Sequence, residues 1–241
     1  MPLIESPRHT PADLAAWHTT ARYDTRLWPT ITAKATRAAQ VIREFSQGGD
    51  CYAGCSWGKD SLVVAHLIAE HHPTIPIVWV RVKKWENPDC GLVRDAFLTQ
   101  YPHITYDEIT VDSAAPRRWE AATQGAARTS TDGFAIAKQR HGRRHISGVR
   151  AQESTTRRLT IARNGEASTN TCRPLAHWTG QDVFTYLAHY DLPIHPAYAM
   201  TYGGALNRER VRVGTLGGER GTGVGRAEWE ETYYPDVVRP L

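Results

Sequence analysis

The chain has 241 residues, with 29 Lys and Arg, 25 Asp and Glu, and a formal net charge of +4 at pH 7. This length suits one α/β domain, or one domain with an appended piece, and the mild positive charge permits an anionic ligand without requiring a long nucleic-acid track. The sequence contains neither a run of about 18 apolar residues nor a secretory signal. We therefore expect a cytoplasmic protein that does not bind a membrane.

The first part of the chain alternates between helical and strand-like patterns. Residues 10–45 place apolar side chains at helical spacing and predict two helices, which end before Gly48 and Gly49. A first strand over 50–55, a helix over 62–72 and a mostly apolar second strand over 75–82 follow. A continuous apolar strand of this kind is typical of a parallel sheet that is buried on both faces.

The alternation continues to about residue 192. It predicts a helix over 91–101, a strand over 104–111, a basic helical stretch over 117–140, a fourth strand over 143–149 and a helix over 180–192. This order predicts an α/β fold with a doubly wound, mostly parallel Rossmann-like sheet and flanking helices.

The same patterns suggest three regions. Residues 1–46 form N-terminal helices that pack on the core, and residues 47–204 form the α/β domain. Residues 205–241 form a C-terminal extension that is rich in glycine and arginine. We expect this extension to be irregular, and mobile unless a ligand or a partner orders it.

The sequence SWGKDS (56–61) follows the first strand and begins a helix. Open α/β sheets bind ligands at the carboxyl ends of their strands, and the amides at a helix start attract anions. Gly58 allows close approach of the backbone, Ser56 and Ser61 add hydroxyl donors, and Lys59 adds a charge. The spacing is not that of a Walker A loop. The pattern favours a phosphate-binding loop over a helix start at which Ser and Asp are only caps and Lys59 is solvated.

Three segments carry a resemblance to a known family. SWGKDS resembles the SGGKDS signature, or PP-loop, of the adenine nucleotide α-hydrolase-like superfamily. GVRAQESTTRR (148–158) is similar to a G-x-R-x-x-E-S-x-x-R stretch of the phosphoadenylylsulfate (PAPS) reductase family. RPLAHWTGQDVFTYLAHYDLPIHPAY (173–198) resembles the R-P-L-x-x-W segment of that family and its continuation. Members of the superfamily bind ATP or a related adenine nucleotide and usually cleave between the α and β phosphates.

The resemblance implies roles for the residues of the loop. Ser56, Gly58, Lys59, Asp60 and Ser61 would hold the nucleotide phosphates, and Asp60 would help to hold Mg²⁺. The alternative for Asp60 is a first-turn acid that complements the helix dipole. The position usually occupied by glycine is Trp57 here, and we expect it to narrow the pocket or to alter the loop.

The other two segments and the second strand supply further candidates. Arg150 and Arg157 would clamp an anion, and Glu153 would orient one of them. The main chain around Val80 would pass beside the adenine, and Arg173 is a candidate phosphate contact, although a structural pairing is also open for it. As catalytic residues we select Lys59, Asp60, Arg150 and Arg157.

The cysteines restrict the chemistry. The four are Cys51, Cys55, Cys90 and Cys172; they form no Cys-x-x-Cys pair and are too few for a disulfide framework, so we expect reduced thiols and no iron–sulfur cluster. Reductases of the family attack sulfur with a cysteine near the C-terminus, and this chain has none after Cys172. We therefore place the reductase activity second.

The leading interpretation is a PP-loop ATP pyrophosphatase that binds ATP with Mg²⁺ and activates an acceptor for sulfur modification of nucleic acid. Basic stretches at Arg117 and Arg118, at 138–145 and in the C-terminal extension would then contact the nucleic acid, and a partner such as a cysteine desulfurase would donate sulfur. The alternatives are a sulfate-assimilation enzyme resembling the small subunit of ATP sulfurylase or PAPS reductase, and a non-catalytic nucleotide-binding module. The sequence does not determine whether the chain forms a homo-oligomer.

Overall fold

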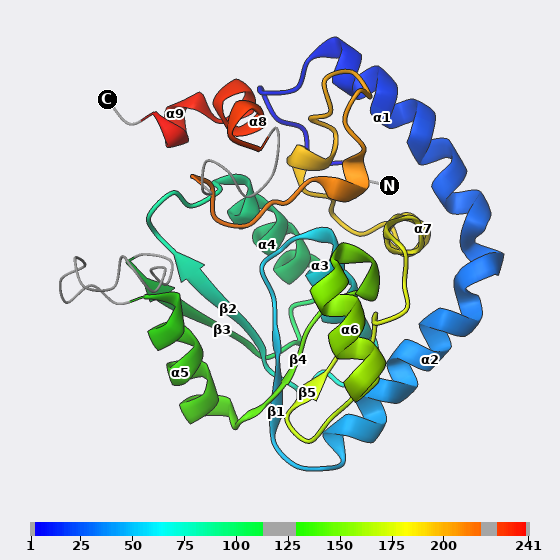
Figure 1. Ribbon diagram of the computed structural model, residues 1–241, viewed down its shortest axis with the longest axis vertical. Coiled ribbons are helices and arrows are strands. Elements are labelled where there is room, and N and C mark those ends of the chain that lie inside the picture. The colour runs from blue at the N-terminus through cyan, green and yellow to red at the C-terminus, as the bar shows by residue number, and fades with distance from the viewer. Residues whose placement is uncertain (1–2, 113–128, 218–225, 240–241) are drawn as a thin grey trace.

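The structure, a computed structural model, describes residues 3–112, 129–217 and 226–239. Its centre is a parallel sheet of five strands in the order β3-β2-β1-β4-β5 (Figure 1). The strands are β1 (Cys51–Gly54), β2 (Ile77–Val82), β3 (Tyr106–Val111), β4 (Arg144–Ile146) and β5 (Thr171–Cys172). The predicted doubly wound α/β fold is confirmed, and the short strand β5 is an addition that the sequence did not reveal.

The helices agree with most of the predicted elements. They are α1 (Pro11–Asp24), α2 (Trp28–Ser46), α3 (Lys59–His71), α4 (Asp89–Gln100), α5 (Ser130–His141), α6 (Thr155–Asn164), α7 (Gly180–His189), α8 (Arg226–Tyr233) and α9 (Pro235–Val238). Four 3₁₀ turns also occur in the described part of the chain: η1 (Thr25–Leu27), η2 (Ala151–Glu153), η3 (Pro196–Tyr198) and η4 (Arg208–Arg210). The predicted basic helix is seen only as α5, because residues 117–128, with Arg117 and Arg118, lie outside the described residues. Helices α6, α8 and α9 were not predicted.

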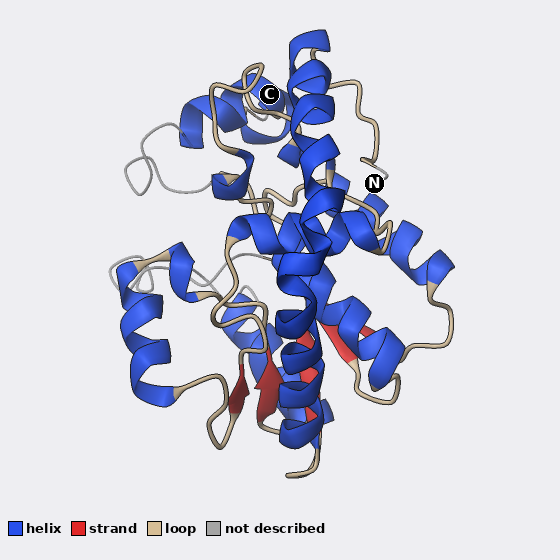
Figure 2. Ribbon diagram, turned by 90° about the vertical axis from the view of Figure 1, so that its right-hand side faces the viewer, coloured by secondary structure: helices blue, strands red, loops and turns tan. Residues whose placement is uncertain are grey.

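Side chains on successive strand positions point to opposite faces of the sheet. On β1, Cys51 and Ala53 face the larger apolar cluster, which also contains buried side chains of α2, α3, α4 and α7. Tyr52 faces the other way, into a small cluster with Val78 and Ala137 of α5. Helices α1 and α2 follow one another along the right-hand side of Figure 1, and Figure 2, which faces that side, shows α2 in front of the strands. Helices therefore cover both faces.

The strand order places a crevice between β1 and β4. From β1 the chain runs to β2 and β3 on one side of the sheet, and then returns to β4 and β5 on the other side. In open α/β sheets, ligands bind outside the carboxyl ends of the strands at the point where the order reverses. The loop that leaves β1 and the segment that leaves β4 both lie at this point, and they contain two of the three motifs.

The C-terminal extension is more ordered than its composition predicted. Trp229, Tyr233 and Tyr234 of the extension are buried in the larger apolar cluster. The hydroxyl of Tyr233 donates to Asp13 at 3.1 Å, and that of Tyr234 donates to the Asp89 carboxylate at 2.7 Å. The described parts of 205–241 therefore pack on the core, and α8 and α9 form part of a segment that was expected to be irregular. The mobility of the extension stays a prediction. The boundaries at 46 and 204 stay predictions.

No helix in the described ranges is long and apolar enough to cross a membrane.

Candidate functional site

A cavity of about 1380 Å³ opens at the carboxyl ends of β1, β2 and β4. Its lining comes from the strand ends, the loop 54–61, the segment 147–157, one face of α5, Tyr198 and residues 207–214. Nine predicted site residues contribute: Ser56, Gly58, Lys59, Asp60, Ser61, Val80, Arg150, Glu153 and Arg157. The tertiary structure thus brings together residues that lie up to about 100 positions apart in the sequence.

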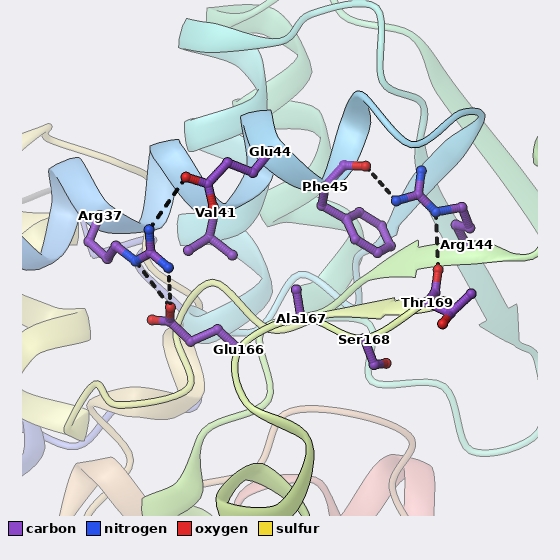
Figure 3. A pocket seen from close by; sticks show the side chains of 9 residues that line it. All are labelled: Arg37, Val41, Glu44, Phe45, Arg144, Glu166, Ala167, Ser168 and Thr169. Atoms are coloured by element: carbon purple, nitrogen blue, oxygen red, sulfur yellow. Dashed lines mark hydrogen bonds and ion pairs between the residues drawn. The ribbon is translucent and has the colours of Figure 1, made fainter.

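A second cavity, of about 470 Å³, lies near the amino ends of β4 and β5 (Figure 3). Its cations are engaged with groups of the protein: Arg37 pairs with Glu166 at 2.9 Å, and Arg144 donates to the Phe45 and Thr169 carbonyls at 2.5 and 3.2 Å. None of the predicted site residues lines it. These contacts join α2 to the sheet, and we assign them a structural role.

The phosphate-binding motif forms a tight turn into α3. Gly58 is the N-cap residue of α3, the Ser61 hydroxyl donates to its carbonyl at 3.0 Å, and the Ser56 amide donates to that hydroxyl at 3.2 Å. The Lys59 amide donates to the Tyr198 hydroxyl at 2.9 Å. The loop is therefore held by its own hydroxyls and by Tyr198, with the positive end of a 13-residue helix directed at the cavity.

Asp60 organises two cations at this helix start. Its Oδ2 atom lies 2.7 Å from Lys59 Nζ, and its Oδ1 atom lies 2.6 Å from Arg150 Nε. The Lys59 and Arg150 side chains are only 5% and 3% exposed, so the carboxylate supplies the charge partner that their burial requires. A single anion thus holds a lysine and an arginine from two different motifs side by side.

The same contacts bear on the predicted magnesium ligand. Both carboxylate oxygens of Asp60 accept charged donors, and the described residues include no group of three or more His, Cys, Asp or Glu side chains arranged for a metal. The assignment of Mg²⁺ to Asp60 stays a prediction.

The segment after β4 is folded around Glu153. Its Oε2 atom accepts from the Arg150 amide at 2.8 Å and pairs with Arg157 Nη1. Gln152 accepts from Arg150 Nη1 at 2.8 Å. Gly148 allows this segment to approach α3, because a Cβ there would lie 2.7 Å from the Asp60 carbonyl carbon. Glu153 contacts both arginines, and their role as a clamp for an anion stays a prediction.

Trp57 does not narrow the pocket. Its side chain is buried in the core, with its ring centroid 5.8 Å from those of Phe97 and Tyr106, and it does not line the cavity. The expectation that it would narrow the pocket is therefore wrong for the side chain. Its φ of 61° lies in the left-handed region, which costs a residue with a Cβ roughly 1–2 kcal/mol. This conformation explains why the related signature usually has glycine at the position.

Arg173 also lies outside the cavity lining. Its amide donates to the Glu166 carbonyl at 2.7 Å, and its Nη1 atom is buried without a hydrogen-bond partner among the described residues. The alternative of a structural position fits this geometry better than the predicted phosphate contact. Val80, in contrast, does line the cavity, on the same face of β2 as Val78.

Comparison with known proteins agrees with the motifs. The phosphoadenosine phosphosulfate reductase domain family matches residues 50–204. The chain belongs to this family. Its sequence is 26% identical over 165 residues to an adenosine 5′-phosphosulfate reductase of Bacillus cereus, covering 64% of this chain and 70% of the relative. It is 26% identical over 163 residues to a phosphoadenosine 5′-phosphosulfate reductase of Xylella fastidiosa, covering 61% and 66%.

Two solved structures are similar at a lower level. An NMN synthetase from Francisella tularensis has a TM-score of 0.43 and 15% identity, covering 66% of this chain and 71% of that chain. The U34-tRNA thiolase NcsA from Methanococcus maripaludis has a TM-score of 0.40 and 18% identity, covering 83% and 77%. At these scores the likenesses carry no argument about function.

The thiols of this PAPS reductase family member are all buried and form no disulfides. Burial raises the pKa of Cys55, which borders the cavity, to about 11, and that of Cys172 to about 12. Burial also raises the pKa of Cys51 and Cys90. At neutral pH these groups are thiols rather than nucleophilic thiolates.

Several residues of the site escaped the sequence analysis. Tyr198 could have been found, because it is the last residue of the third motif. Phe134, which is 50% exposed, lines the cavity from α5, but the pattern of that helix carries no motif. Lys138, one turn further along α5, was noted only as part of the basic stretch 138–145. Arg210 and Arg212 were noted only as part of a basic extension, and only the fold places them at the cavity.

Proposed function

We propose that this chain is an adenine-nucleotide-dependent enzyme that binds its nucleotide in the large cavity. The apolar side chains Val78, Val80 and Phe134 lie toward β2 and α5, whereas Lys59 and Arg150 lie at the start of α3. An aromatic base favours apolar walls and polyphosphate favours cations and helix amides. This arrangement supports a nucleotide with its base beside Val78, Val80 and Phe134 and its phosphates at the loop, with Lys138 as a cation on the α5 side.

The leading candidate reaction is cleavage of ATP between the α and β phosphates. An acceptor oxygen would attack the α phosphorus, the bond to the bridging oxygen would break, and pyrophosphate would leave with the electron pair. Lys59, Arg150 and the amides of the loop would stabilise the charge that develops on the departing group. The observation that carries this proposal is the pair of nearly buried cations that Asp60 holds at the start of α3.

The acceptor in this candidate is nucleic acid that is activated for sulfur modification. Adenylation makes the oxygen of the acceptor a leaving group, and sulfur would then come from a separate donor such as a cysteine desulfurase. A separate donor suits a chain whose own thiols are buried and have raised pKa values. This step goes beyond the family assignment, because a shared fold does not define a substrate.

The second candidate is a reaction on a sulfonucleotide, as in sulfate assimilation. Both the family match and the reductase names of the relatives favour it more directly than they favour modification of nucleic acid. Reduction of a sulfonucleotide needs a thiolate that attacks sulfur, and the four thiols of this chain are poorly suited to that step. In this candidate the attacking thiol belongs to a partner protein.

One assay separates the candidates. The purified protein is incubated with Mg²⁺ and ATP, with and without short RNA and DNA, and in parallel with phosphoadenylylsulfate, adenylylsulfate and reduced thioredoxin. We expect pyrophosphate and AMP from ATP, lost in Lys59→Ala and retained in Lys83→Ala, an exposed lysine outside the cavity lining. Sulfite release without pyrophosphate would replace the first candidate by the second. ATP binding without turnover in any mixture would identify a non-catalytic nucleotide-binding module.

A further inference from the structure

Residues 207–214 of the C-terminal extension form one wall of the cavity. Exposure alternates along this wall: Arg210 and Arg212 are exposed, whereas Val211 and Val213 are only 5% and 4% exposed. Arg210 is the last residue of the 3₁₀ turn η4, and Val211, which follows it, has extended backbone with φ −63° and ψ 131°. The two valines therefore hold the segment on the core, and the two arginines stand on the free side.

This wall is anchored at both ends and in the middle. At one end, Arg208 pairs with the buried Asp24 at 2.5 Å. At the other, the Leu216 amide donates to the Trp85 carbonyl at 2.7 Å. Between them, Val213 packs directly on the phosphate loop. The backbone that carries the two arginines is therefore fixed relative to that loop.

The space available to Val213 is limited. A Cβ on Gly58 would lie 2.9 Å from the Val213 Cγ2 atom, so the loop and the wall are already in close contact. This contact places Arg212, the preceding residue, beside the loop that is proposed to hold the nucleotide phosphates.

The described acidic side chains that line the cavity do not pair with Arg210 or Arg212, so both guanidinium groups are available to a ligand. Asp60 is taken up by Lys59 and Arg150, and Glu153 pairs with Arg157. The neighbouring acid, Glu209, lies against the start of α7, where its Oε2 atom occupies the space that a Cβ on Gly180 would need. Within the described part of the chain, the side chains of Arg210 and Arg212 make no hydrogen bond or ion pair.

The size of the cavity leaves room for a second ligand. Its volume of about 1380 Å³ exceeds the roughly 300–1,000 Å³ of typical sites for one small molecule. A guanidinium presents a planar set of donors that matches phosphate oxygens, and Arg210 and Arg212 both line the cavity with exposed side chains. The wall thus has the shape and the charge for a phosphate group that is separate from those at the loop.

We propose that Arg210 and Arg212 form a subsite for a phosphate group of the acceptor. The assignment of the bound group to an acceptor rests on the proposed function, in which the loop holds the phosphates of ATP. The phosphate belongs either to a single mononucleotide or to a nucleic-acid strand. Both sources present the same phosphate ester oxygens to the two guanidinium groups.

The test uses the full chain and two matched double variants. Arg210→Ala/Arg212→Ala removes the subsite, and Arg158→Ala/Arg163→Ala removes two exposed arginines of α6 outside the cavity lining. Calorimetry measures the binding of ATP, and then of thymidine monophosphate and a single-stranded thymidylate 12-mer to the ATP-loaded protein. A third variant, Arg210→Lys/Arg212→Lys, keeps the charge and removes the planar forks, so it serves if the alanine variant does not fold.

We expect the alanine variant of the wall to lose about tenfold or more in affinity for at least one thymidylate probe, with ATP affinity unchanged. A loss of affinity for the 12-mer alone identifies a nucleic-acid strand as the acceptor. In that case the slope of log affinity for the 12-mer against log salt concentration should be shallower in the variant than in wild type by about 1.4, for two lost phosphate contacts. Loss for the mononucleotide identifies a small acceptor. The α6 variant should match wild type.

The subsite is refuted if neither probe binds wild type, or if both double variants bind the probes equally. A fall in ATP affinity confined to the wall variant would also overturn it, because the arginines would then hold the phosphates of ATP itself. Failure of wild type to bind ATP would instead contradict the proposed function, and the probe titrations repeated without ATP would still report on the wall.

Discussion

The carboxylate of Asp60 holds the site together, and Asp60→Asn removes its charge with little change of shape. Two ion pairs, at 2.7 and 2.6 Å to Lys59 and Arg150, are lost, and the two nearly buried cations remain without an anion. Removing one member of a buried ion pair costs about 3–5 kcal/mol. Because the Asp60 side chain is 19% exposed, we take the lower end, about 3 kcal/mol.

Thermal unfolding measures this loss. For a chain of this size each kcal/mol corresponds to about 2–4 °C, so the melting temperature should fall by about 6–12 °C. The control is Asp95→Asn, which breaks an ion pair with Arg94 at 2.8 Å in which the Asp95 side chain is 65% exposed. Exposed pairs contribute only about 0–1 kcal/mol, so the control should melt within about 4 °C of wild type.

Inorganic pyrophosphate then tests whether the two cations form an anion site. In Asp60→Asn an added anion replaces the missing carboxylate, so pyrophosphate should raise the melting temperature of the variant more than that of wild type. A melting temperature as close to wild type as that of the control would show that Asp60 does not hold the two cations. If pyrophosphate raises the melting temperature of Asp60→Asn no more than that of wild type, Lys59 and Arg150 do not form the phosphate site.

Two further predictions address the base and the core. Phe134→Ala should weaken ATP binding by about 1–3 kcal/mol through loss of a stacking surface, whereas Leu159→Ala, an exposed residue of α6 outside the cavity lining, should not; equal titration curves would remove Phe134 from the site. Burial lowers the pKa of His66 from 6.5 to about 4, so the unfolded state binds this proton first as the pH falls. The unfolding free energy should therefore drop by about 1.4 kcal/mol per pH unit from pH 6.5 toward 4 on account of His66. Urea unfolding at pH 7.5 and at pH 5 measures this fall in unfolding free energy, which should be smaller in His66→Asn than in wild type. An equal fall in both proteins would contradict the assignment of the pH dependence to His66.

The sequence was most informative where local patterns decide the structure. The apolar run after SWGKDS determines that α3 is a buried helix, because a helix that is apolar on nearly all sides is stable only inside the protein. The alternation of such helices with short apolar strands determines a parallel sheet with crossovers, since consecutive parallel strands need a long connection. The motifs then identified the family and the polar residues at the start of α3 and after β4 that line the cavity.

The tertiary structure decided what depends on contacts between distant segments. A single Asp60 that bonds to both Lys59 and Arg150 requires the ends of β1 and β4 to be neighbours, which no local pattern specifies. The direction of Trp57 depends on the space beside Phe97 and Tyr106, so a motif position expected in the pocket belongs to the core. The extension that composition predicted to be mobile is held by buried valines and tyrosines, whose partners lie as far away as the first helix. Local sequence determines the elements through propensity and periodicity, whereas long-range packing determines which side chains face the cavity.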